Sequence, residues 1–202
     1  MKLLRSLILA LPLALSAVTA RAEIVPLTEI NDYLNTIVTA QGDFTQINAD
    51  GTISTGRLYL RRPGRIRFEY DPPDNGLVMA GGGKVAVFDP KSNTPPEQFP
   101  LKRTPLSIIL ASKVDLTTAN MVVGHREDGP ATVIDAQDPE NPEIGSISLM
   151  FTGAPVELRQ WIIRDDVGNE TTVILGELEQ DVRLGPALFS IVQETKARMG
   201  NN

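Results

Sequence analysis

Hydrophobic residues near the start of the chain recur at helical spacing. Over residues 27–38 they lie three and four positions apart, which predicts a helix with one apolar face. Pro26 suits the first turn of this helix, and Gly42 ends the pattern. The apolar positions of the predicted helix are Leu27, Ile30, Leu34 and Ile37.

From residue 43 onward the chain is predicted to form mostly strands. Short segments of alternating polar and apolar residues recur at intervals of about 8–12 residues, separated by Gly, Pro, Asn and Asp. This spacing is typical of an antiparallel sheet or barrel, here of about ten or eleven strands. The predicted strand segments are GDFTQINADG, GTISTGRLYLRRP, RIRFEYDPP, LVMA, KVAVFDP, MVVGHRED, ATVIDAQD, GSISLMFTG, VELRQWIIRD and ETTVILGELEQD.

A second, short helix is predicted over residues 104–112. Thr104 suits its N-cap and Pro105 its first helical position. Its apolar stripe contains Leu106, Ile109 and Leu110. Near the end of the chain, LGPALFSI is predicted to be a closing apolar segment and RMGNN a loose tail.

The fold class that follows is mainly β (α+β), with two or three helices. A sheet of this size must bury one face, either by curling or by packing under helices. Because two short helices cannot fill such a concave face, the pattern favours an apolar interior cavity beneath a helical cover. The candidate lining residues, each of which could equally be ordinary core, are Leu34, Ile37, Leu58, Leu60, Ile66, Phe68, Tyr70, Leu106, Ile109 and Leu110.

One of the five arginines in GRLYLRRPGRIRFEY, residues 56–70, falls on the apolar side of its strand. Strand residues two apart share a face, so Arg62 shares the face of Leu58 and Leu60. A buried guanidinium is costly unless it is paired. We therefore expect Arg62 either to bond backbone carbonyls of the covering helix or its loop, or to extend to water. The arginines predicted to face solvent are Arg57, Arg61, Arg65 and Arg67.

The first 22 residues are predicted to be a cleaved secretory signal peptide. Two basic residues precede an apolar run that ends at about Val18, and Ala20-Arg21-Ala22 has the small-x-small pattern of a cleavage site. Cleavage would change the formal net charge from −6 to about −9. That charge argues against binding to nucleic acid or to an anionic membrane. Residues 23–202 are predicted to form a single soluble domain.

Little in the sequence favours catalysis or metal binding. The chain has no cysteine, which excludes disulfides and thiolate ligands, and His125 is its single histidine. The motifs G-x-S-x-G and H-E-x-x-H are absent, and most acidic residues lie in turn-like stretches such as DPENPE. We therefore expect no enzymatic activity, no cofactor and no metal site, with His125 at the surface near a hairpin end.

Several short motifs follow one another along most of the chain. They are FTQ at 44–46, the Asp50-Gly51 turn, G-x-L-x-L-x-R-P-G-R-x-R-F-E-Y across 56–70, Pro72-Pro73, Gly83-Lys84 leading to VFD at 87–89, and P-L-x-x-T-P-L at 100–106. In this combination the chain resembles the periplasmic outer-membrane lipoprotein carrier family, LolA. It departs from the family at Ala86, where a tryptophan is common, and at Gly82, where the family has an aspartate.

The resemblance implies an incomplete antiparallel barrel closed by a helical lid over an apolar cavity. It also implies a periplasmic chaperone whose cargo is lipid-modified lipoproteins. Such carriers receive cargo from an inner-membrane ABC transporter complex and deliver it to an outer-membrane lipoprotein receptor. The family arginine that matches Arg62 bonds lid carbonyls in the closed form, which implies a lid latch here. A monomer is the default expectation for such a shuttle.

Other functions remain open on the same fold. The chain could carry a different amphiphile, such as a glycolipid. An envelope-stress sensor of this fold has an additional C-terminal domain, for which we expect little room in residues 23–202. The outer-membrane receptor needs a lipidated cysteine, which the sequence does not contain.

Overall fold

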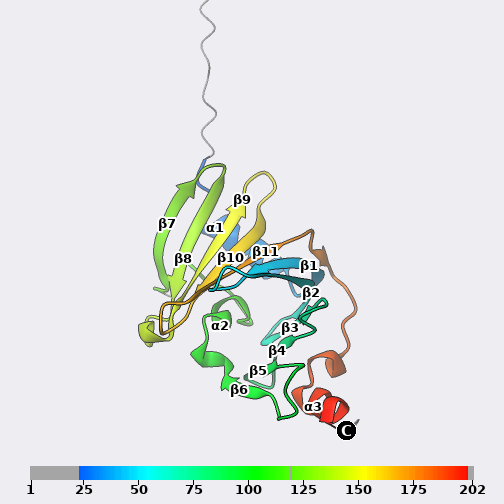
Figure 1. Ribbon diagram of the computed structural model, residues 1–202. Helices are drawn as coiled ribbons and strands as arrows, with labels where there is room; N and C mark the ends of the chain where they lie inside the picture. Colours follow the sequence, from blue (N-terminus) through cyan, green and yellow to red (C-terminus); the bar gives the residue numbers. More distant parts are fainter. Residues whose placement is uncertain (1–22, 119, 200–202) are drawn as a thin grey trace, which may run out of the picture.

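The structure is a computed structural model that describes residues 23–118 and 120–199. The predicted signal peptide, residues 1–22, lies outside the described residues. The described residues form one curved antiparallel sheet of 12 strands (Figure 1). Its strands pair in the order β6-β5-β4-β3-β2-β1-β11-β10-β9-β8-β7, with β12 also paired to β1. Within the described residues no pairing joins β6 to β7, so the barrel is incomplete and the predicted fold class is confirmed.

The two halves of the sheet meet at β1. This strand pairs with β2 along its whole length and with β11 from the Phe44–Leu175 pair onward. The strands of the first half are β1 (Thr39–Ile47), β2 (Ile53–Arg61), β3 (Arg65–Tyr70), β4 (Leu77–Gly81), β5 (Lys84–Phe88) and β6 (Glu97–Pro100). Those of the second half are β7 (Val122–Asp128), β8 (Ala131–Gln137), β9 (Ser146–Thr152), β10 (Glu157–Arg164), β11 (Glu170–Leu175) and β12 (Glu179–Gln180).

Within the described residues, six short helical segments connect or cover these strands. The α-helices are α1 (Leu27–Thr36), α2 (Leu106–Ile109) and α3 (Ile191–Met199). The 3-10 segments are η1 (Leu101–Arg103), η2 (Pro142–Ile144) and η3 (Pro186–Phe189). In Figure 1, α2 lies inside the curve of the sheet, whereas α3 lies outside it near the strands β3 to β5.

Strand β1 begins earlier than the sequence pattern predicts. Gly42, expected to end the first helix, lies within β1 opposite Leu58. A Cβ at Gly42 would lie 2.6 Å from the carbonyl oxygen of Glu177, so glycine permits the close approach of the loop between β11 and β12. That loop also divides the predicted segment ETTVILGELEQD into two strands. Strand β6 was not predicted because all four of its residues are exposed and show no alternation.

The predicted second helix is shorter than residues 104–112. The Thr104 hydroxyl donates to the carbonyl of Leu101 at 2.8 Å, and it caps no N–H group of α2, so the predicted N-cap is wrong. Helix α2 ends at Ile109. The carbonyl of Leu110 then accepts from the N–H of Gly64, in the turn between β2 and β3, at 2.9 Å. This tertiary hydrogen bond takes the place of a further helical turn.

The main core fills the concave side of the sheet. Helix α1 contributes Ile30 and Leu34 to it, and α2 contributes Leu106 and Ile109. Facing them are side chains from both halves of the sheet, among them Leu58, Phe68, Leu149, Phe151 and Trp161. We call α1 and residues 101–116 the helical lid, because together they cover this concave core.

A second layer covers the convex side of β4 and β5. We call residues 184–199 the C-terminal strap. Ile191 of the strap packs with Leu77, Met79, Ala86 and Phe88, which form a smaller core cluster of their own. Two residues of the predicted loose tail, Arg198 and Met199, belong to α3, so that prediction is wrong for them. The C-terminal strap thus buries the part of the convex face formed by β4 and β5.

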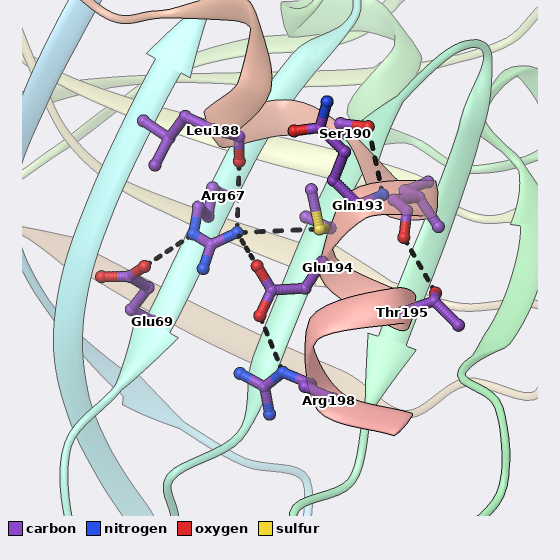
Figure 2. Close-up of polar contacts among 10 residues, drawn as sticks. Arg67, Glu69, Leu188, Ser190, Gln193, Glu194, Thr195 and Arg198 are labelled. Carbon is purple, nitrogen blue, oxygen red and sulfur yellow. Dashed lines mark hydrogen bonds and ion pairs between the residues drawn. The ribbon is translucent and has the colours of Figure 1, made fainter. Parts of the chain in front are cut away.

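Arg67 lies beneath the C-terminal strap (Figure 2). Its Nε donates to Glu69 at 2.6 Å, and its Nη1 donates to Glu194 at 2.9 Å and to the Leu188 carbonyl at 3.2 Å. Arg198 donates to the other oxygen of Glu194 at 2.8 Å. Burial of Glu194 acts to raise its pKa, but the hydrogen bonds from Arg198 and Arg67 outweigh burial and hold that pKa below its usual value.

The prediction that Arg67 faces solvent is therefore wrong. Strand alternation places it correctly on the convex face, but alternation cannot show that a distant segment covers that face. Arg57 is exposed as predicted. Arg61 and Arg65 are half-buried, and Arg61 Nη1 donates to the carbonyl of Leu184 in the strap at 2.6 Å.

We expect Arg67→Met to lower the free energy of unfolding by about 2–3 kcal/mol, because Glu194 and the Leu188 carbonyl lose a charged donor in a mostly buried site. Urea-induced unfolding followed by circular dichroism measures the change. Arg57→Met is the matched control, since Arg57 lies exposed on β2 at 4.0 Å from an exposed carboxylate, and we expect a change within about 0.5 kcal/mol. Equal losses in the two variants would contradict the clamping role of Arg67.

Candidate functional site

The interior beneath the helical lid holds a small apolar cavity. Its volume is about 20 Å³, which is room for roughly one water molecule. The residues that line it are Leu34, Ile37, Ala40, Leu58, Leu60, Arg62, Ile109, Leu158, Trp161 and Leu178. The larger open space expected from the sequence is filled by side chains in this closed arrangement, so that expectation is wrong for the structure as it stands.

The cavity brings together about half of the predicted site residues. Leu34, Ile37, Leu58, Leu60, Ile109 and Arg62 line it. Ile66, Phe68, Leu106 and Leu110 are buried in the same core without lining the cavity. Tyr70 is half-buried, its hydroxyl donates to Gln46 at 2.7 Å, and burial raises the pKa of Tyr70 to about 12. The role of these residues in binding a ligand stays a prediction.

Four lining residues were missed by the sequence analysis: Ala40, Leu158, Trp161 and Leu178. Leu158 and Trp161 stand three residues apart on β10, so simple alternation would place them on opposite faces. The pairing of β10 with β9 shifts register between Leu158 and Gln160, and this irregularity brings Leu158 and Trp161 to the same cavity. The sequence carries no signal for that shift.

Arg62 enters the core from the turn after β2. The residue is only 9% exposed, and its Nε donates to the carbonyl of Ile37 at 2.8 Å. Burial lowers the pKa of the Arg62 guanidinium from its ordinary value. Among the described residues, its buried Nη1 atom has no hydrogen-bond partner. Arg62 is thus held by a hydrogen bond at one nitrogen and left unpaired at another.

The turn at residues 62–64 binds the C-terminal ends of both lid helices. The backbone N–H of Arg62 donates to the carbonyl of Val38 at 2.8 Å, and the N–H of Gly64 donates to the carbonyl of Leu110 at 2.9 Å. The last carbonyls of a helix have no partner within the helix. Ile37 and Leu110 are the C-cap residues of α1 and α2, so this turn satisfies carbonyls at both ends.

The two parts of the helical lid are also joined to each other. Asn35 Nδ2 donates to the carbonyl of Val114 at 2.8 Å, and the N–H of Val114 donates back to Asn35 Oδ1 at 3.0 Å. The N–H of Leu116 donates to Asn31 Oδ1 at 2.9 Å. These bonds connect α1 to the loop after α2 and so join the two parts of the lid.

Across residues 23–118 and 120–199, no group of three or more His, Cys, Asp and Glu residues is arranged to hold a metal ion. His125 is exposed on β7, with its Nε2 at 3.0 Å from the carbonyl oxygen of Val25. In the same part of the chain, no helix is both long enough and apolar enough to cross a membrane.

We expect Asn35→Ala to speed amide hydrogen exchange at Val114 and Leu116 by about tenfold or more, because the loop loses two hydrogen bonds to α1, each contributing about 1 kcal/mol. Exchange measured by mass spectrometry of peptides covering residues 110–118 tests this. Asp32→Ala is the matched control, since Asp32 lies exposed on the same helix. Unchanged exchange in Asn35→Ala would show that the two parts of the lid are not coupled through Asn35.

Comparison with known proteins places this arrangement in a family. The chain matches the family model described as outer membrane lipoprotein carrier protein LolA over residues 35–192. It is 27% identical over 198 residues to an outer-membrane lipoprotein carrier protein of Methylococcus capsulatus, with 90% of each chain covered. A protein of that description from Chromohalobacter salexigens is 27% identical over 190 residues, covering 90% of this chain and 87% of the relative. A third, from Pseudomonas aeruginosa, is 26% identical over 202 residues, with 94% of each chain covered.

Among solved structures, a LolA superfamily protein from Nitrosomonas europaea is similar with a TM-score of 0.46 and 9% identity, covering 82% of this chain and 98% of that one. The family model runs from the last turn of α1 to the first turn of α3, and so includes all 12 strands of the sheet. On this match, the chain belongs to the outer membrane lipoprotein carrier protein family, LolA.

Proposed function

We propose that the protein is a periplasmic carrier that holds the acyl chains of lipid-modified lipoproteins beneath its helical lid. The observation that carries this proposal is an apolar concave core whose two lid helices are both capped by one turn, in a chain of the lipoprotein carrier family. The activity is binding and release, without a chemical reaction. The periplasmic location rests on the predicted signal peptide.

The hydrophobic effect supplies the affinity for an acyl chain. Each buried methylene contributes about 0.8 kcal/mol. A chain of roughly sixteen carbons would therefore prefer an apolar site by on the order of 12 kcal/mol, as an upper bound. Once the lid moves, the residues available to contact that chain are the predicted set: Leu34, Ile37, Leu58, Leu60, Ile66, Phe68, Tyr70, Leu106, Ile109 and Leu110.

Opening of the lid must precede binding, because the cavity of about 20 Å³ cannot take an acyl chain. The closed state then competes with cargo and lowers its net affinity. This closed state gains the hydrogen bond from Arg62 to Ile37, but it also leaves Arg62 Nη1 buried without a partner among the described residues. An unpaired buried donor is unfavourable. A lid of such limited stability suits a carrier that must both load and unload.

The proposed partners follow from membership of the family. Cargo would arrive from an inner-membrane ABC transporter complex and leave to an outer-membrane lipoprotein receptor, with the carrier acting as a monomer. Neither step needs an energy source on the carrier itself if the receptor binds the acyl chains more tightly. The equilibrium between the closed and open lid sets how tightly the carrier binds cargo in competition with the transporter and the receptor.

Mass spectrometry of molecules that co-purify with the protein from native periplasm tests the class of cargo. We expect acylated lipoprotein, because its hydrocarbon is the ligand that an apolar concave core accommodates. Co-purification of a free glycolipid without lipoprotein would instead support the alternative, a carrier or sensor of another amphiphile.

The proposed latch role of Arg62 predicts the behaviour of Arg62→Leu. This variant loses the hydrogen bond to Ile37, and a loss of about 1 kcal/mol shifts the lid equilibrium roughly fivefold toward the open form. We expect it to retain cargo longer and deliver less of it in a two-component transfer assay with the purified receptor. Arg57→Leu, which changes an exposed arginine of the preceding strand, should deliver normally. Normal handover by Arg62→Leu, together with an unchanged affinity of this variant for an alkyl chain that lacks a carbonyl, would remove the latch role.

A further inference from the structure

Two residues that line the cavity each carry a buried hydrogen-bond donor without a partner in the described part of the chain. One donor is Nη1 of Arg62 and the other is the indole Nε1 of Trp161. Both residues line the same small cavity, and their exposed fractions are 9% and 1%. They are the only buried side-chain nitrogen or oxygen atoms without a partner across residues 23–118 and 120–199. Their coincidence at one apolar site calls for a physical explanation.

Packing alone does not explain them. A buried donor without an acceptor loses its hydration and gains nothing in return, so such groups are rare in folded proteins. Phenylalanine at position 161 would supply an apolar ring without an unpaired N–H group. The remaining cavity residues, including Leu34, Leu58 and Ile109, offer no side-chain acceptor. Since no acceptor reaches these donors within residues 23–118 and 120–199, a bound ligand that carries an acceptor would satisfy them.

We propose that Arg62 Nη1 and Trp161 Nε1 form a recognition site for the carbonyl oxygen at the head of a bound acyl chain. This inference rests on the proposed function and deepens it, since it names the polar atom of the ligand that the apolar cavity recognises. A carbonyl oxygen has two lone pairs and accepts from two donors. It lies directly beside the hydrocarbon, so chain burial brings it to a site surrounded by leucine and isoleucine side chains.

The same arrangement links cargo binding to the lid. Arg62 Nε holds the carbonyl of Ile37 at the end of α1, while its Nη1 faces the ligand site in this proposal. A cargo carbonyl that binds Nη1 would therefore contact the same side chain that holds the lid closed through Nε. Trp161 donates no side-chain hydrogen bond to the lid within the described residues; it lies on β10 and packs edge-on against Phe68, with ring centroids 6.2 Å apart. Replacing Trp161 by phenylalanine therefore tests ligand recognition while the hydrogen bond from Arg62 to Ile37 stays in place.

The test compares three probes with the same sixteen-carbon chain. 1-Monopalmitoylglycerol carries an ester carbonyl, N-palmitoylethanolamine carries an amide carbonyl, and 1-O-hexadecylglycerol has an ether in place of the ester. Binding is measured by displacement of a fluorescent fatty acid from the full protein, at probe concentrations below micelle formation. We expect the wild-type protein to bind the carbonyl probes at least about fivefold more tightly than the ether, since one hydrogen bond contributes about that factor.

Trp161→Phe should lower this carbonyl-to-ether ratio about fivefold and leave binding of the ether nearly unchanged. The matched control is Phe68→Leu, which alters the packing around Trp161 without removing a donor and should change all three affinities alike. Arg62→Met provides a second variant: loosening the lid acts equally on every probe, so only loss of the carbonyl contact lowers the ratio. Trp161 is the single tryptophan of the chain, and its emission should shift to longer wavelength with the carbonyl probes only.

The outcomes separate this inference from the proposed function. A preference for only one carbonyl probe supports the inference and identifies the ester or the amide linkage as the ligand group. Equal affinity for all three probes in the wild-type protein, or a ratio unchanged in Trp161→Phe and Arg62→Met, overturns the inference and leaves the carrier function standing. Failure of all three probes to bind overturns the proposed function and the inference together.

Discussion

The turn between β2 and β3 is the constraint on which the closed form depends. Apolar contacts beneath the lid are non-directional and do not fix where a helix sits. The turn adds direction, because Arg62 and Gly64 donate to carbonyls at the C-terminal ends of α1 and α2. A single tight connection between two strands therefore sets the position of both lid helices. Asn31 and Asn35 then join the two parts of the lid into one unit.

The two coverings of the sheet are attached in different ways. On the convex side, the C-terminal strap is clamped to the sheet by charged hydrogen bonds from Arg67 to Glu194 and to the Leu188 carbonyl, while Arg198 holds Glu194 from within α3 (Figure 2). On the concave side, the lid is held mainly by apolar packing and hydrogen bonds to backbone carbonyls, with one donor of Arg62 left unpaired. This contrast suits a carrier in which the sheet stays fixed while the lid moves.

Sequence patterns predicted the elements of the fold well, and parts of the candidate site. Helical spacing identified α1, and alternation placed Arg62 on the apolar side of β2. Alternation failed at β10, where a register irregularity brings Leu158 and Trp161 together. It also failed to describe the surroundings of Arg67, because the covering segment lies more than a hundred residues away in the chain.

The sequence by itself determined the class of fold, the apolar face of most elements and the family, since these follow from local periodicity and from motifs that lie close together along the chain. Tertiary structure alone decided how full the concave core is, which donors stay unpaired, and that the convex face is covered by the C-terminal strap. Those features depend on side-chain volumes and contacts between residues far apart in the chain. A one-dimensional pattern records which face is apolar, but it does not record what packs against that face.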